Sequence, residues 1–141
     1  MEIMDLPFHP MLVHFPIALF ITACGLQILG LTIKKDSLTQ TAFIVYIVAT
    51  LMTPIAVVTG WLEANEHHLH HRVLDLHRFF AFMTMGGSLI SIPILFVIRK
   101  KIRSQFDVVF LLIFLFIVIL IALTAYNGGR LVFDYGVGMK E

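Results

Sequence analysis

Four long apolar segments limit what this chain can fold into. They cover roughly residues 10–33, 40–63, 75–98 and 105–126, and each is long enough to cross a bilayer, which takes about 20 apolar residues. Because backbone polar groups in hydrocarbon must be satisfied within the protein, a spanning segment of this length is a helix. The sequence therefore predicts an all-α integral membrane protein, an antiparallel four-helix transmembrane bundle that forms a single domain over residues 1–141.

The composition fits this class. Of the 141 residues 59% are hydrophobic and 13% are charged, whereas soluble domains carry about 25% charged residues. The formal charge of +1 gives no indication of a nucleic-acid partner, and one cysteine cannot form a disulfide framework. We find no phosphate-binding loop, no nucleophile motif and no internal repeat. These features favour an electron-transfer or binding protein over a stand-alone enzyme.

The basic residues predict the direction of the crossings. Lys and Arg accumulate on the cytoplasmic side of membrane proteins. Six of the ten such residues lie in the two short connections: Lys34, Lys35, Arg99, Lys100, Lys101 and Arg103. The opposite side carries Arg72, Arg78, Arg130 and Lys140. We therefore expect both termini on the extracytoplasmic side.

All seven histidines fall on that same side. His9 and His14 lie at the start of the first crossing, and His77 lies just inside the third. The other four crowd the connection before it: His67, His68, His70 and His71. Ionisable residues inside a membrane are functional-site candidates, and imidazole is the commonest metal ligand in proteins.

His14 and His77 form the sharpest pair. Each lies about one turn inside the outer end of its expected helix, so the two rings should have similar depth. Two neutral imidazoles on facing helices can hold haem iron between them. Arg72, Arg78 and Arg130 are then available for the propionates. The alternative is that each histidine only hydrogen-bonds a carboxylate or a loop carbonyl.

His9 and the loop histidines indicate a different kind of site. His9 is five residues before His14, about 140° away around a helix, so the two cannot share one ion from one face. We expect it above the bundle, as a hydrogen-bonded strut or beside the loop. If the loop is helical, His67 and His71 could share Zn or Cu. The alternatives to haem are therefore a metal-binding or transport-accessory protein that uses His9, His67 and His71, and a cofactor-free structural subunit.

Several motifs carry a resemblance to a known family. The chain resembles DUF2231, a family of bacterial membrane proteins, in HPMLVHFPIA at 9–18, TGW at 59–61, His77, and GGRLVFDYGVGM at 128–139. The resemblance implies a four-helix membrane domain in which His9, His14 and His77 match the recurrent histidines of the family. The family is itself similar to small four-helix b-type cytochromes, and this implies haem b and electron transfer.

The resemblance completes the expected function. We expect a small cytochrome b-like protein of the bacterial inner (cytoplasmic) membrane, with its histidines facing the periplasm or the exterior. A redox protein or a quinone is the expected partner, within a homo-oligomer or a larger membrane complex. Many members carry a histidine where this chain has Tyr135, and we expect that tyrosine to hydrogen-bond. The glycine-rich tail at 127–139 should form an ordered turn outside the last span.

Overall fold

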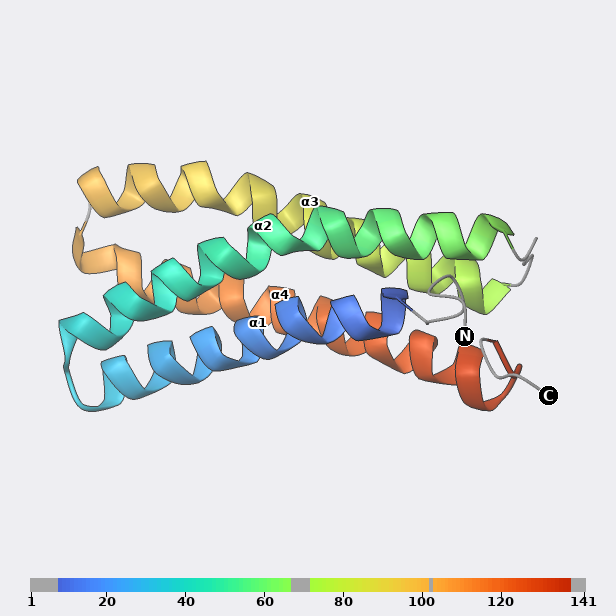
Figure 1. Ribbon diagram of the computed structural model, residues 1–141. Coiled ribbons are helices and arrows are strands. Elements are labelled where there is room, and N and C mark those ends of the chain that lie inside the picture. Colours follow the sequence, from blue (N-terminus) through green and yellow to red (C-terminus); the bar gives the residue numbers. More distant parts are fainter. Residues whose placement is uncertain (1–7, 67–71, 102, 138–141) are drawn as a thin grey trace.

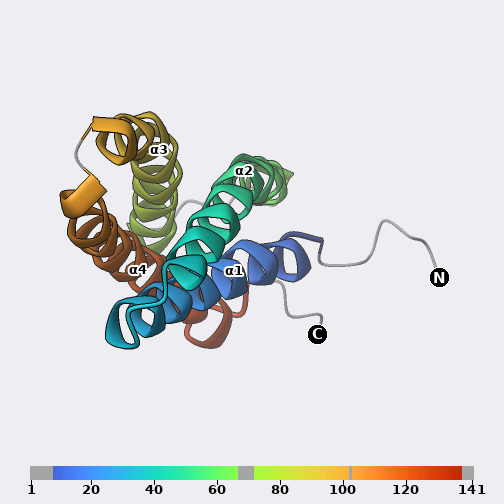
Figure 2. The same cartoon turned by 90° about the vertical axis from the view of Figure 1, so that its left-hand side faces the viewer.

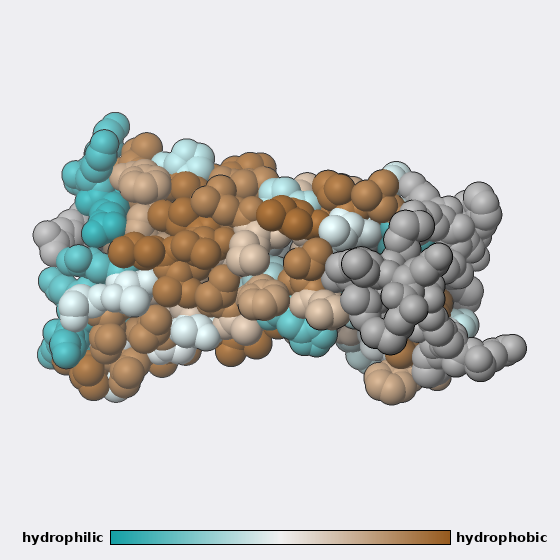
Figure 3. Space-filling view, in the orientation of Figure 1, coloured by the Kyte–Doolittle hydropathy of each residue, from teal (hydrophilic) through white to brown (hydrophobic). Residues whose placement is uncertain are grey.

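The computed structural model describes residues 8–66, 72–101 and 103–137, which form four helices (Figure 1). These are α1 (Phe8–Thr32), α2 (Asp36–Glu66), α3 (Arg72–Lys101) and α4 (Arg103–Phe133). Each is long and apolar enough to cross a membrane. Hydrophobic residues form a band over the middle of the molecule, and hydrophilic residues gather at one end (Figure 3). The predicted all-α bundle of four membrane helices is confirmed.

The four helices pack as two hairpins. The N-hairpin is α1 with α2, and the C-hairpin is α3 with α4; packing within each is far more extensive than packing between them. The two contacts between hairpins, α2 with α3 and α1 with α4, are similar in extent. Viewed along the bundle, the hairpins stand apart as two pairs (Figure 2). We call the end with the α1–α2 and α3–α4 connections the connection end, and the opposite end the histidine end.

The α1–α2 connection is tight because two residues permit it. Lys34 adopts a left-handed conformation with φ of 53°, and the amide of Lys35 donates to the Gly30 carbonyl at 2.9 Å, as in a helix C-cap. A Cβ on Gly30 would lie 2.9 Å from Thr39 Oγ1. The glycine therefore lets α2 leave the turn directly against α1.

Aromatic side chains join the hairpins in the half near the connection end. Tyr46 of α2 packs edge-on against Phe114 of α4 with ring centroids 4.8 Å apart, and against Phe20 of α1 at 5.5 Å. The Tyr46 hydroxyl lies 2.6 Å from Ser91 Oγ on α3, so this side chain contacts all three other helices. Such packing and interhelical hydrogen bonds drive helix association in lipid, where the hydrophobic effect does not.

The helices extend beyond the apolar segments from which they were predicted. The prediction that a turn follows residue 126 was wrong for residues 127–133, because α4 continues through Gly128 and Gly129 to Phe133. Leu131 in this last stretch is buried against Val73 and Leu74 of α3. A glycine costs a helix only about 1 kcal/mol relative to alanine, and this packing offsets it.

Candidate cofactor site at the histidine end

His77 is fixed against α4. Its ring is half-buried, and Nδ1 lies 2.9 Å from the carbonyl oxygen of Thr124. Because a carbonyl only accepts, we assign the proton to Nδ1, which leaves a lone pair on Nε2. A Cβ on Gly128 would lie 3.1 Å from His77 Cε1. The His77 ring therefore packs directly against the backbone of α4 at Gly128.

His9 is fixed against α2 in the same way. Its Nδ1 lies 3.2 Å from Thr59 Oγ1, and the Thr59 hydroxyl donates to the Ala56 carbonyl at 3.0 Å. The hydroxyl oxygen therefore accepts from Nδ1–H, and Nε2 again keeps a lone pair. A Cβ on Gly60 would lie 2.6 Å from His9 Cε1, closer than a side chain there would permit.

The two hairpins thus repeat one arrangement. In each hairpin a histidine on the first helix lies over a glycine on the second helix, His9 over Gly60 and His77 over Gly128. Each ring also lies beside the residue four positions before that glycine, which is Ala56 for His9 and Thr124 for His77. The spacing along the chain is the same, from residue 9 to 60 and from 77 to 128. The two histidines are 68 positions apart, as are the two glycines, and Tyr46 and Phe114, whose rings are in contact, have the same separation.

The sequence shows no internal repeat, yet the two hairpins share this placement of one histidine over one glycine. Both hairpins run from the histidine end to the connection end and back (Figure 1). The first helix of each hairpin therefore begins at the histidine end, and the second helix returns to it.

The two histidines lie at the same end of the bundle, His9 on α1 against α2 and His77 on α3 against α4. The two rings and the Glu63 carboxylate are within range of electrostatic interaction. Glu63 lies one turn after Gly60 on α2, on the helix face that meets His9. The structure therefore brings together two imidazoles, one from each hairpin, with a carboxylate beside them.

His14 does not take part in this arrangement. Its side chain is exposed on α1, and its Nδ1 hydrogen-bonds the Pro10 carbonyl in the preceding turn. We expected His14 opposite His77 and placed His9 in a loop because Pro10 follows it. However, α1 already begins at Phe8, and a first-turn proline is compatible with a helix. His9 is therefore helical, and it takes the inward position.

The predicted propionate partners occupy three different environments. The Arg78 guanidinium lies 4.7 Å from the centre of the Trp61 ring, and its charge acts on His77. Arg130 Nε lies 3.0 Å from Asp134 Oδ2. Arg72 is exposed at the start of α3. Arg78 is thus the cation nearest the paired rings.

An apolar groove runs beside the site between α2 and α3. Trp61, directly after Gly60, and Phe82 form part of it, with ring centroids 5.9 Å apart. The remaining lining is Pro54, Val57, Val58, Leu62 and Met85. The site therefore has donor atoms and an apolar wall side by side.

Most of the alternative metal site lies outside the described residues. His67 and His71 lie outside the described residues, so only His9 of that set can be placed. Within the described residues no three His, Cys, Asp or Glu side chains are grouped closely enough to hold a metal ion. Tyr135 is exposed, after the end of α4.

Gly60 and Gly128 were missed as site residues. They lie within the TGW and GGR motifs, so the signal was present in the sequence. What it lacked was the partner ring, because the fold brings His9 and His77 to these glycines from another helix.

Together the fold and the site define a four-helix membrane protein with paired histidines at one end. The chain belongs to a family described as predicted membrane proteins (DUF2231), whose model matches residues 5–141. The resemblance drawn from the sequence motifs is thereby confirmed. No curated protein and no solved structure matches the chain.

Proposed function

We propose that this protein binds haem b between His9 and His77 and transfers single electrons. The observation that carries the proposal is the pair of imidazoles, one from each hairpin, each with Nδ1 fixed and Nε2 available. Two imidazoles, from His9 and His77, would suffice to hold haem iron. Hydrogen bonds from the other ring nitrogen fix the orientation of such ligands and raise their basicity.

The donor set favours haem over a bare metal ion. Structural zinc takes four protein ligands and catalytic zinc takes three, and the described residues group no three. A porphyrin supplies the four equatorial nitrogens itself, so two histidines complete its coordination. Bound haem would supply a reversible one-electron couple.

The surrounding residues have distinct tasks in this proposal. The Thr59 hydroxyl and the Thr124 carbonyl hold the two rings, while the groove at Trp61 and Phe82 keeps water from the macrocycle edge. Arg78 provides a cation for a propionate. Arg72 is exposed and can approach as well, and Arg130 would have to exchange its partner Asp134.

The proposal includes a location and a partner. The connection end carries Lys34, Lys35, Arg99, Lys100 and Lys101, and such a cluster favours the cytoplasmic side. The histidine end then faces the periplasm or the exterior from a bacterial inner membrane. Electrons would be exchanged there with a quinone or a redox protein.

An absorption spectrum of the purified protein tests the proposal. Expressed with ample haem, the protein should show a b-type band on reduction. His9→Ala and His77→Ala should each abolish that low-spin band, because one axial ligand is lost. His14→Ala is the matched control from the same helix and should leave the spectrum unchanged.

Three outcomes would contradict the proposal. A haem-free protein that retains zinc or copper by elemental analysis would indicate the metal-binding alternative. A protein with neither cofactor would indicate a structural subunit. Loss of the band in His14→Ala together with its persistence in His9→Ala would restore the pairing expected from the sequence.

A further inference from the structure

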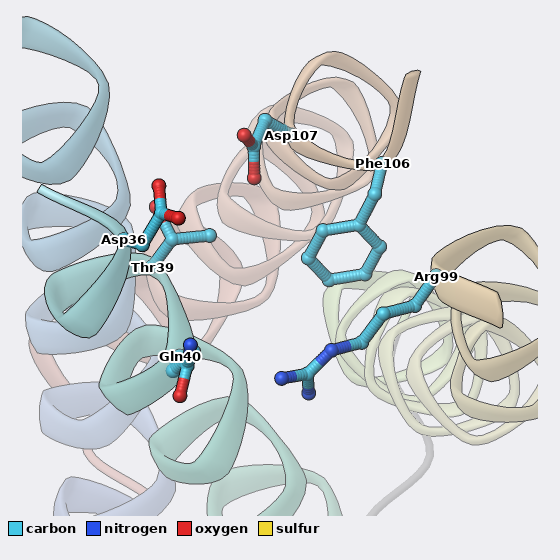
Figure 4. Close-up of a pocket in the computed structure, with 6 residues that line it drawn as sticks. All are labelled: Asp36, Thr39, Gln40, Arg99, Phe106 and Asp107. Carbon is cyan, nitrogen blue, oxygen red and sulfur yellow. The ribbon is translucent and has the colours of Figure 1, made fainter. Parts of the chain in front are cut away.

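A polar pocket lies at the connection end, away from the histidines. Its lining comes from α2, α3 and α4, so it opens between the two hairpins (Figure 4). The residues are Asp36, Thr39, Gln40, Arg99, Phe106 and Asp107. The proposed haem site uses none of them.

The pocket holds charges of both signs on opposite sides. Arg99 extends into the hollow from α3, while Asp36 and Asp107 line it from α2 and α4 (Figure 4). Two rings hold the guanidinium in place, since its carbon lies 5.4 Å from the centre of Phe43 and 5.7 Å from that of Phe106. This arrangement suits a ligand that carries a cation and an anion a few ångströms apart.

The depth of the pocket indicates where such a ligand comes from. Asp36 is the first residue of α2 and Arg99 lies in the last turn of α3. Toward the middle of the bundle the surface of α3 and α4 becomes apolar, with Phe96, Val97 and Val108 exposed, and that of α2 becomes apolar from Ile44. The pocket therefore lies where the apolar band ends, at the level of the lipid headgroups.

We propose that this pocket binds the headgroup of a phospholipid that carries a primary ammonium, of the phosphatidylethanolamine type. The phosphate pairs with Arg99, and the ammonium donates to the carboxylates of Asp36 and Asp107. Thr39 and Gln40 supply further hydrogen bonds to the headgroup. The acyl chains continue along the exposed apolar surface beside Val108.

The chemistry of the lining discriminates among common lipids. A choline headgroup has no N–H to donate to a carboxylate, and a glycerol headgroup brings no cation to the two aspartates. Beside the pocket, the buried Gln27 of α1 donates to the backbone carbonyl of Asp107 at 3.2 Å, which links α1 to the start of α4.

Native mass spectrometry of the full chain tests this binding. The probes are phosphatidylethanolamine, its N-methyl and N,N-dimethyl forms, phosphatidylcholine and phosphatidylglycerol. Retention should fall with each methyl group added, by about tenfold in total, because hydrogen bonds to charged groups are lost. Asp107→Asn and Asp36→Asn should weaken retention of the ethanolamine lipid, and Arg99→Gln should abolish it. Lys100→Gln, an exposed cation at the same end, is the matched control.

The remaining outcomes overturn the proposal. Equal retention of all members of the methylation series would show that Asp36 and Asp107 do not accept hydrogen bonds from the ammonium. If phosphatidylglycerol were retained more strongly than phosphatidylethanolamine, the pocket would be a site at which Arg99 binds anionic lipids without a role for the ammonium. Displacement of the lipid by soluble glycerophosphoethanolamine at equal concentration would show a site for the free headgroup. Size-exclusion chromatography of each variant separates loss of binding from loss of folding.

Discussion

Gly60 and Gly128 decide where the two histidine rings can lie. A side chain at Gly60 would come within 2.6 Å of His9, and one at Gly128 within 3.1 Å of His77. Glycine in a helix is disfavoured by about 1 kcal/mol relative to alanine, so neither position is chosen for helix formation. Each glycine instead lets a ring reach the backbone of the neighbouring helix.

Alanine at these glycines should disturb the site unequally. Gly60→Ala should lower haem affinity about tenfold or more, because the His9 ring must leave its place. Gly128→Ala should have a smaller effect, since His77 needs to shift by only a few tenths of an ångström. Titration of the apoprotein with haem, followed by absorbance, measures both.

Gly86→Ala is the matched control, because a Cβ there meets nothing within 4 Å. If Gly60→Ala bound haem as tightly as the unchanged protein, His9 would not need its present position to act as a ligand.

The hydrogen bond to His9 can be removed without changing the shape of the side chain. Thr59→Val deletes the hydroxyl that accepts from Nδ1, so haem affinity should fall by about tenfold, as for other partners of metal-ligating histidines. Thr41→Val is the control, because the Thr41 hydroxyl is exposed and bonds only within its own helix in the described structure. If both variants lost haem affinity to a similar extent, the effect would come from reduced helix stability and not from the lost hydrogen bond to His9.

At the scale of elements, the hairpins are the units, and one polar contact that joins them in the described part of the chain is the bond between Tyr46 and Ser91. The Ser91 hydroxyl donates to the Ser88 carbonyl at 2.7 Å, so the Tyr46 hydroxyl donates to Ser91 across the interface. Both side chains are buried. This bond therefore belongs to the contact between α2 and α3 and to neither hairpin alone.

A double-mutant cycle measures what this bond contributes. Tyr46→Phe keeps the ring and should lower the free energy of unfolding by about 1 kcal/mol, the size expected for a hydrogen bond inside a membrane protein. Ser91→Ala should cost a similar amount. The two changes together should cost less than their sum, because they remove one bond. Additive effects would show that the two hydroxyls do not interact.

The sequence predicted the elements better than their rotation about their own axes. Hydropathy located all four helices, because a membrane span depends on length and composition. The choice between His9 and His14 depended on the rotation of α1, and Pro10 pointed to a start that was too late. Gly128 and Gly129 were read as turn residues for a similar reason. The residues of α3 that pack against this part of α4, His77 on Gly128 and Val73 and Leu74 on Leu131, are far away in the chain.

For the whole molecule, the proposed orientation makes a labelling prediction. In a Cys24→Ser background, Arg72→Cys should react with a membrane-impermeant maleimide in intact cells. Lys35→Cys should react only after permeabilisation, because the basic connection end faces the cytoplasm. In the unchanged protein Cys24 is buried, so that protein should stay unlabelled in both conditions. The reverse labelling pattern would show that the protein has the opposite orientation in the membrane.

The like packing of the two hairpins has a consequence for the origin of the chain. A hairpin crosses the membrane an even number of times, so its two ends stay on one side. Two copies of one gene for such a hairpin could thus be fused end to end without inverting either half.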